Sequence, residues 1–345
     1  MHSRHCLAAI AAVLLAGWNA WAAAAVPLRL AVIGDSDSQA YQGSRSGNDA
    51  QRGGSHHATT LQWTEALHRL RGAQVDQGPW GWYGTYGKLA TAGEWLGLEM
   101  RAPRKEDFRF NFAVSGAGCG DLMASTRQVP QLVRLMDQEP AAWRDGVVLI
   151  RIGVNDFGQN GSLERLARDP RDAQVAPRID HCITELRHAV AYLRQRHPQT
   201  RLVLVGIFNN AHIGDGVRRW RSPAMQHNIA AALDRYDDAL RAMAAGDARI
   251  AFFDDRAWFA SHWGGRAADG GLAYRVVAVA GRFRVRNTQG DAPDNAVLAD
   301  GHAGTAWNAL WAQALVDLLN RRFKAGLAPV RDTEILPLVE AGGRA

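Results

Sequence analysis

The chain has 345 residues, of which 47% are hydrophobic and 21% charged, and its formal net charge is +6. This is the composition of a globular protein with one large core or at most two small ones. The arginines are scattered among acidic residues instead of forming a stripe, which argues against a nucleic-acid-binding protein.

The N-terminal segment has the pattern of a secretory signal peptide. Basic side chains precede an apolar run, Leu7–Gly17, and the motif Ala20-Trp21-Ala22 suits cleavage. An uncleaved membrane anchor is the alternative, but the run is shorter than the ~20 residues that a spanning helix needs. Because Trp18 follows the run in place of a cysteine, a lipid anchor is not expected. The sequence therefore predicts a signal peptide over residues 1–25 and a periplasmic or secreted mature protein.

Strand-like and helix-like patterns alternate along the rest of the chain. The strand-like runs are Leu28–Ile33, Arg109–Val114, Val147–Ile152, Arg201–Ile207 and Arg249–Phe253. Apolar residues at helical spacing mark Leu61–Leu70, Tyr86–Leu96, Val129–Asp137, Arg178–Arg196, Ala224–Met243 and Ala303–Phe323. Strands that alternate with helices at this length pair in parallel through right-handed crossovers.

The alternation predicts one α/β domain over residues 26–323. Its core is expected to be a doubly wound, flavodoxin-like sheet of five parallel strands with helices on both faces. A small β-hairpin insert is expected over Tyr274–Val285 and Asn287–Asn295. The segment 324–345 is predicted to be a poorly ordered tail. In such a fold the site lies at the carboxyl ends of the strands.

The first strand leads directly into a candidate nucleophile. The run Leu28–Ile33 breaks at Gly34 into small polar residues, which is how a buried strand delivers a side chain to the rim of a sheet. Ser36 is that candidate. A serine needs a histidine base, an orienting carboxylate and oxyanion donors to act as a nucleophile. The alternative is an ordinary Gly-Asp-Ser turn.

Later strand ends supply those partners. The second strand runs into Gly116, where a glycine lets a backbone N–H approach a ligand closely. The third strand runs into Asn155, whose amide is a candidate oxyanion donor. Before the last helix, Asp300 and His302 offer a carboxylate and an imidazole together. Taken singly, each residue also suits a turn or a helix cap; together, on the expected strand ends, they favour a site.

The chain resembles the SGNH hydrolases, also called the GDSL esterase/lipase superfamily. The four blocks of that family correspond to Gly34-Asp35-Ser36, Gly116, Gly153-Val154-Asn155-Asp156 and His302. The resemblance implies Ser36 as nucleophile, His302 as base, and an oxyanion hole made by the backbone N–H groups of Ser36 and Gly116 with the Asn155 amide. It also implies ester or thioester hydrolysis without a metal or other cofactor.

Two positions depart from the family pattern. Asp37 stands where the family often has leucine, and the acid of the last block usually lies three residues before the histidine, where this chain has Ala299. We take Asp300 as the candidate catalytic acid, acting through an altered turn. A backbone carbonyl, or a carboxylate such as Asp254 or Asp294, is the alternative, with Asp300 as a helix-preceding cap.

Two irregular stretches are candidate substrate-contacting segments. Gln42–Thr60, which is rich in Gly, Ser, Asn and His, is predicted to be a mobile lid that controls access without carrying a catalytic group. Trp80, Trp82 and Tyr83 are candidate substrate-binding residues that form an aromatic platform for a sugar ring or acyl group. The alternative is that these rings pack under a surface loop.

Cys119 and Cys182 are the cysteines that remain after signal cleavage. An even pair in an oxidising compartment predicts a disulfide, which lies near the active-site rim if both strand-end assignments hold. Two unpaired buried thiols are the alternative.

These residues favour an exported serine esterase that acts through an acyl-enzyme. The expected substrate is an O-acetyl ester of an envelope or extracellular glycan; a lipid or lysophospholipid ester, or a thioester, is the alternative. A non-catalytic carbohydrate-binding protein of the same fold is a further possibility. The α/β-hydrolase fold is disfavoured because no serine lies in a Gly-x-Ser-x-Gly motif. A metal site made by Asp35, Asp37, His56 and His57 is disfavoured because their spacing matches no strong ligand pattern.

Overall fold

A computed structural model describes residues 26–43, 52–96, 100–214, 216–266 and 272–342. The predicted signal peptide and the middle of the predicted lid, residues 44–51, lie outside this range.

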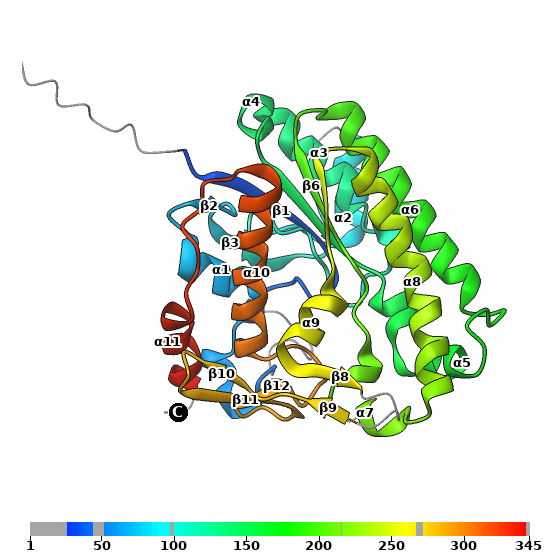
Figure 1. Ribbon diagram of the computed structural model, residues 1–345. Coiled ribbons are helices and arrows are strands. Elements are labelled where there is room, and N and C mark those ends of the chain that lie inside the picture. Colours follow the sequence, from blue (N-terminus) through cyan, green and yellow to red (C-terminus); the bar gives the residue numbers. More distant parts are fainter. Residues whose placement is uncertain (1–25, 44–51, 97–99, 215, 267–271, 343–345) are drawn as a thin grey trace, which may run out of the picture.

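The centre of the molecule is a parallel sheet of five strands in the order β2-β1-β5-β6-β7 (Figure 1). These strands are β1 (Leu28–Gly34), β2 (Val75–Asp76), β5 (Val147–Arg151), β6 (Arg201–Val205) and β7 (Ile250–Phe253). Their residues are nearly all buried, as expected for strands covered on both faces. The order confirms the predicted doubly wound fold.

Helices cover both faces of the sheet (Figure 1). One face packs against α3 (Gln128–Gln138), α5 (Asn160–Arg168), α6 (Ala176–Arg196) and α8 (Pro223–Gly246). The other packs against α1 (Trp63–Arg71), α9 (Asp255–Trp263) and α10 (Thr305–Phe323), and α11 (Asp332–Gly342) packs on α10. The other described α-helices are α2 (Gly87–Trp95), α4 (Pro140–Trp143) and α7 (Gly216–Arg219). Among the described residues, no helix combines the length and the apolar character needed to cross a bilayer.

Smaller sheets lie outside the central one. Strands β3 (Trp80–Tyr83) and β4 (Lys105–Phe108) pair antiparallel, as do β8 (Gly264–Arg266) and β9 (Leu272–Tyr274). In the region of the predicted hairpin insert, β10 (Val277–Val279) pairs antiparallel with β11 (Phe283–Gln289), and β12 (Asn295–Val297) pairs parallel with β11. A hairpin is therefore present there, but its turn lies earlier than predicted.

The predicted strand Arg109–Val114 is not a regular strand. The segment runs parallel to the second half of β1 and forms one isolated bridge, Val32 to Asn111. The N–H groups of Phe112 and Val114 donate to β1, but the Gly34 N–H donates to Gln128 Oε1 at 2.9 Å and not to this segment, which ends the ladder. The short strand β2 pairs with the first half of β1 instead.

The segment after α10, predicted to be a poorly ordered tail, packs against the domain. The chain turns at Lys324, which has a φ of 53°, and α11 then lies against α10. Leu327, Val330, Ile335 and Val339 are buried. Their spacing gives the segment enough apolar surface to offset the entropy cost of ordering it.

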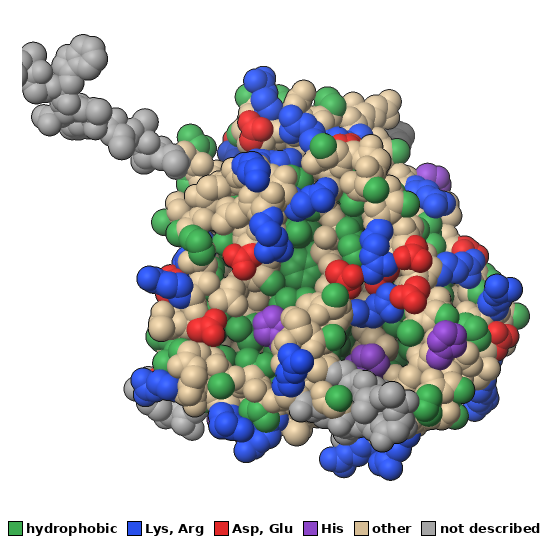
Figure 2. All heavy atoms as spheres, viewed as in Figure 1, with side chains coloured by type: hydrophobic (Ala, Val, Ile, Leu, Met, Phe, Trp, Pro, Cys, Tyr) green, Lys and Arg blue, Asp and Glu red, His purple; other side chains and the backbone are tan. Residues whose placement is uncertain are grey.

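Basic and acidic side chains are interspersed over the face shown in Figure 2. This surface has no stripe of one sign, as the scattered arginines of the sequence predict.

Candidate active site

Ser36 lies in a tight turn at the carboxyl end of β1. The Asp35 carbonyl accepts the N–H groups of Ser38 and Gln39, and its side chain accepts the Asp37 N–H at 2.9 Å. Gly34 allows β1 and β5 to approach closely, because a Cβ at this position would lie 2.3 Å from the Arg151 carbonyl oxygen. The turn thus projects Ser36 beyond the sheet.

Arg151, at the end of β5, holds this turn in place through a hydrogen bond to its backbone. Its Nη1 donates to the Asp37 carbonyl at 3.0 Å, and its Nη2 donates to Asp255 at 2.8 Å. Asp255 is fully buried and also accepts the Trp311 indole N–H at 2.9 Å. A buried arginine with a paired carboxylate therefore anchors the backbone next to Ser36.

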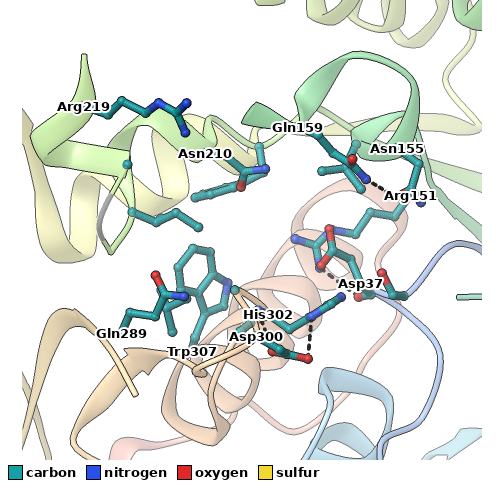
Figure 3. Close-up of a pocket in the computed structure, with 18 of the residues that line it drawn as sticks. Asp37, Arg151, Asn155, Gln159, Asn210, Arg219, Gln289, Asp300, His302 and Trp307 are labelled. Atoms are coloured by element: carbon teal, nitrogen blue, oxygen red, sulfur yellow. Dashed lines mark hydrogen bonds and ion pairs between the residues drawn. The ribbon is translucent and has the colours of Figure 1, made fainter. Parts of the chain in front are cut away.

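Ser36, Asn155 and His302 line one cavity of about 510 Å³. Figure 3 shows Asn155, Asp37 and His302 at one end of it and Arg219 and Gln289 at the other. The structure thus brings together three residues that the sequence places on separate strand ends. Further lining residues that sequence analysis did not identify include Gln159, Phe208, Asn210, Arg219, Gln289 and Trp307.

Asp300 contacts the imidazole of His302. Its Oδ2 lies 3.0 Å from His302 Nδ1, at an ion-pair distance but off the direction of a hydrogen bond. Its Oδ1 accepts the His302 backbone N–H at 3.1 Å. Partial burial opposes ionisation, but His302 and Arg52 outweigh it and hold the pKa of Asp300 below its ordinary value.

The two alternative acids have other partners. Asp254 caps α9 through the Ala257 N–H at 3.0 Å and pairs with Arg241 at 2.8 Å. Asp294 pairs with Arg286 at 3.2 Å. Of the three carboxylates, Asp300 is the one the structure places against His302.

Arg52 is a residue of the site that the sequence did not reveal. Its Nε donates to Asp300 Oδ2 at 2.8 Å, and its Nη2 lies 3.3 Å from His302 Nε2. The side chain is 3% exposed and stacks over the Tyr41 ring at 4.8 Å. Arg52 belongs to the segment predicted to be a lid without a catalytic group, and no local motif marks it.

Hydrogen bonds orient the amide of Asn155. Its Nδ2 donates to the Ala117 carbonyl at 2.8 Å, and its Oδ1 accepts from Gln159 at 2.7 Å. The second Nδ2 hydrogen is left for a substrate oxygen. Gly116 lies in an exposed turn with a φ of 82°, one residue before Ala117, and is not among the residues that line the cavity.

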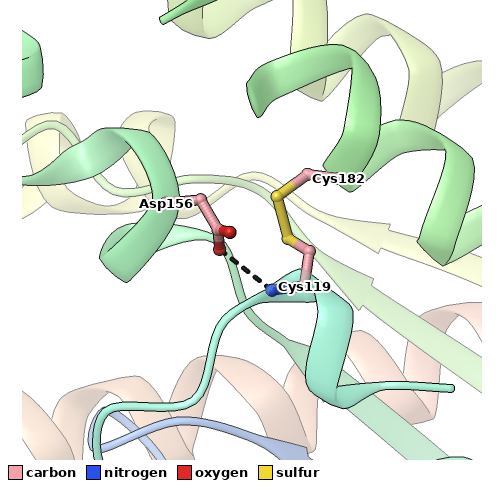
Figure 4. Close-up of side chains that lie close together, drawn as sticks. All are labelled: Cys119, Asp156 and Cys182. Carbon is pink, nitrogen blue, oxygen red and sulfur yellow. Dashed lines mark hydrogen bonds between the residues drawn. A yellow bond between two sulfur atoms is a disulfide. The ribbon is translucent and has the colours of Figure 1, made fainter. Parts of the chain in front are cut away.

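A disulfide joins Cys119 to Cys182, with their Cα atoms 5.0 Å apart (Figure 4). Asp156 lies beside it and accepts the Cys119 N–H at 2.9 Å. These contacts connect the loop after Gly116 both to α6 and to the loop that carries Asn155. Within the described ranges, Cys119, Cys182 and Asp156 are the one cluster of potential metal-ligand side chains, and its cysteines are bonded to each other.

The aromatic residues predicted to bind substrate lie on β3, which pairs antiparallel with β4. Trp80 packs edge-on against Phe108 at 5.0 Å, Trp82 lies under Arg104 at 5.1 Å, and Tyr83 donates to the Pro79 carbonyl at 2.9 Å. None of the three lines the cavity of Ser36 and His302. The structure therefore does not bring them to this site.

Comparisons with known proteins agree with the fold. The sequence profile of the GDSL-like lipase/acylhydrolase family matches residues 77–273, more than half of the chain. The match includes Gly116 and Asn155; Ser36 and His302 lie outside it. No curated protein sequence matches the chain.

Solved structures that match the chain include an extracellular lipase from Streptomyces rimosus and a family two carbohydrate esterase from Clostridium thermocellum. The lipase has 19% identity, covers 68% of this chain and 83% of its own, and has a TM-score of 0.32. The carbohydrate esterase has 12% identity, covers 87% of this chain and 65% of its own, and has a TM-score of 0.33.

The chain belongs to the GDSL-like lipase/acylhydrolase family and is a carboxylic ester hydrolase. The family match confirms the resemblance inferred from the sequence.

Proposed function

We propose that the protein is an exported serine esterase that removes a small acyl group, such as acetyl, from a hydroxyl of an envelope or extracellular glycan. The observation that carries the proposal is the shared cavity of Ser36, His302 and Asn155, with Asp300 against His302 Nδ1. The N-terminal signal pattern and the disulfide support export.

The proposed reaction proceeds in two halves. Ser36 Oγ bonds to the ester carbonyl carbon while His302 Nε2 takes its proton. The developing oxyanion is held by the backbone N–H group of Ser36 and by Asn155 Nδ2. His302 then gives the proton to the leaving alcohol, and acyl-Ser36 remains. Water attacks the acyl carbon, His302 takes the water's proton, and Ser36 recovers it as the carboxylic acid leaves.

The wall of the cavity favours a polar substrate. The carboxamide side chains of Asn155, Gln159, Asn210 and Gln289 line the cavity together with the rings of Phe208 and Trp307. Amides beside aromatic rings suit the hydroxyls and the flat faces of a sugar, whereas a long acyl chain needs a continuous apolar groove. The cavity therefore supports the glycan ester over the lipid ester.

An ester panel tests this proposal. The purified protein is assayed on p-nitrophenyl esters from acetate to palmitate and on O-acetylated glycans, beside the Ser36→Ala variant. We expect the highest kcat/KM on acetyl esters, release of acetate from the glycan, and loss of both activities in Ser36→Ala. A preference for palmitate would contradict the glycan assignment and favour a lipid ester.

A further inference from the structure

The base of the proposed triad has a second charged neighbour besides Asp300. The guanidinium of Arg52 bridges the pair, with Nε on Asp300 Oδ2 at 2.8 Å and Nη2 at 3.3 Å from His302 Nε2. A guanidinium can only donate hydrogen bonds, so Nε2 must be the accepting nitrogen in this contact. The proton of the neutral ring then sits on Nδ1, on the side of Asp300. This is the tautomer that a general base needs.

The described parts of the lid segment hold Arg52 in place. The His57 ring Nδ1 contacts the Arg52 carbonyl at 2.8 Å. Glu65 accepts the N–H groups of Tyr41 and Gln42, where the lid segment begins, at 3.1 and 2.8 Å. It also accepts the N–H of Gln62, just after the segment ends, at 2.8 Å, so one carboxylate binds the backbone at both ends. These hydrogen bonds hold the backbone that presents the buried Arg52 side chain to Asp300.

We propose that Arg52 is a positioning residue for the esterase reaction, which fixes the Asp300 carboxylate and selects the Nδ1–H tautomer of His302. This inference rests on the proposed function. Arg52 does not line the cavity, so it acts through Asp300 and His302 and not through contact with substrate. When Ser36 donates its proton to Nε2, the Nη2 contact is given up and the Nε contact with Asp300 persists.

The test uses Arg52→Gln, which keeps bulk against Tyr41, and Arg52→Lys, which keeps the charge. Arg71→Gln is the matched control, because Arg71 is also buried and paired with a carboxylate, Glu334 at 2.9 Å, but does not contact the site residues. We expect Arg52→Gln to lower kcat about 100-fold, as for a misplaced catalytic group, with little change in KM. Arg52→Lys, which keeps the cation, should recover part of the lost kcat, and Arg71→Gln should change only stability.

A kcat within about twofold of wild type in Arg52→Gln would overturn the proposal. A second measurement needs no variant at position 52: ¹⁵N NMR of histidine-labelled wild-type protein, with His302 assigned from His302→Gln. We expect the Nδ1–H tautomer, and an Nε2–H tautomer would overturn the proposal even if the Arg52 variants failed to fold. Absence of ester turnover in wild type would defeat the proposed function alone, because the tautomer is measured without turnover.

Discussion

At the scale of single residues, the departure from the family spacing has a structural explanation. Asp300 lies two residues before His302, and Gly301 between them has a φ of 90°, a conformation that glycine adopts without strain. The turn is closed by hydrogen bonds from the Gly301 N–H to the Leu298 carbonyl at 2.9 Å and from the Leu298 N–H to the His302 carbonyl at 2.7 Å. This turn brings the carboxylate back to Nδ1.

Ser36 and His302 are expected to act as one unit. Ser36→Ala and His302→Ala should each lower kcat by roughly a thousandfold or more, and the double variant should be little worse, because loss of either member disables the other. Steady-state kinetics on a p-nitrophenyl ester measure this. Multiplicative losses in the double variant would show that the two residues act independently.

Asp300→Asn tests the shifted acid. If the carboxylate holds the ring and stabilises its charged form, kcat should fall by about 10⁴, as in the serine-protease template. Asn155→Ala, which removes one oxyanion donor and leaves the nucleophile intact, should cost less, about 10²–10³. An Asp300→Asn variant with kcat close to wild type would assign the orienting role to another group.

At the scale of elements, the site depends on links between loops that follow different strands. The disulfide and Asp156 connect the Gly116 loop to α6 and to the Asn155 loop, and Glu65 closes the segment that carries Arg52. None of these links lies within one secondary-structure element.

Removing the disulfide should lower stability. The Cys119→Ala/Cys182→Ala variant loses a cross-link between residues 63 positions apart. In the chain-entropy model, closure of such a loop stabilises the fold by about 4 kcal/mol. Urea unfolding of both proteins under oxidising conditions measures the difference. Equal unfolding free energies would contradict the expectation.

Glu65 should give stability a distinct pH dependence. Burial raises its pKa to about 7, although three backbone N–H donors favour the charged form. Its pKa in the unfolded chain is ~4.3, so between these values the native state binds more protons. The contribution is therefore fully present below about pH 4 and is lost as the pH rises through about 7.

Glu65→Gln removes this titration and leaves the other groups in place. The unfolding free energy of wild type minus that of the variant should fall between pH 5 and pH 8, as measured by urea titration at each pH. A difference that is constant or rises with pH would show that Glu65 is charged in the native state throughout.

At the scale of the whole molecule, the fold was predictable because buried parallel strands and amphipathic helices leave strong local patterns. Five of the described α-helices were not predicted: α4, α5, α7, α9 and α11. Of these, α4 and α7 have only four residues each, α9 has little amphipathic pattern and is marked mainly by its Asp254 cap, and α11 contains Pro337. The strand predicted at Arg109–Val114 is not regular because the Gly34 N–H donates to the Gln128 side chain, a contact across 94 residues that periodicity does not register.

Residues of the site could be predicted from the sequence only where they lie next to the end of a strand or the start of a helix. Ser36, Asn155 and His302 follow strands or precede a helix, so their motifs have a structural context. Arg52 meets Asp300 across 248 residues from a polar segment without periodicity, and Trp307 lies within a helix whose apolar residues all resemble core. Such residues become visible only when the chain is folded.

The most direct test of the central claim, that Ser36 is an activated nucleophile, is labelling with a fluorophosphonate followed by mass spectrometry of the modified peptide. We predict one adduct on Ser36 in the wild-type protein, no adduct in Ser36→Ala, and much slower labelling in His302→Ala. A folded wild-type protein that resists the probe, or a Ser36→Ala variant that is labelled as fast as wild type, would contradict the account.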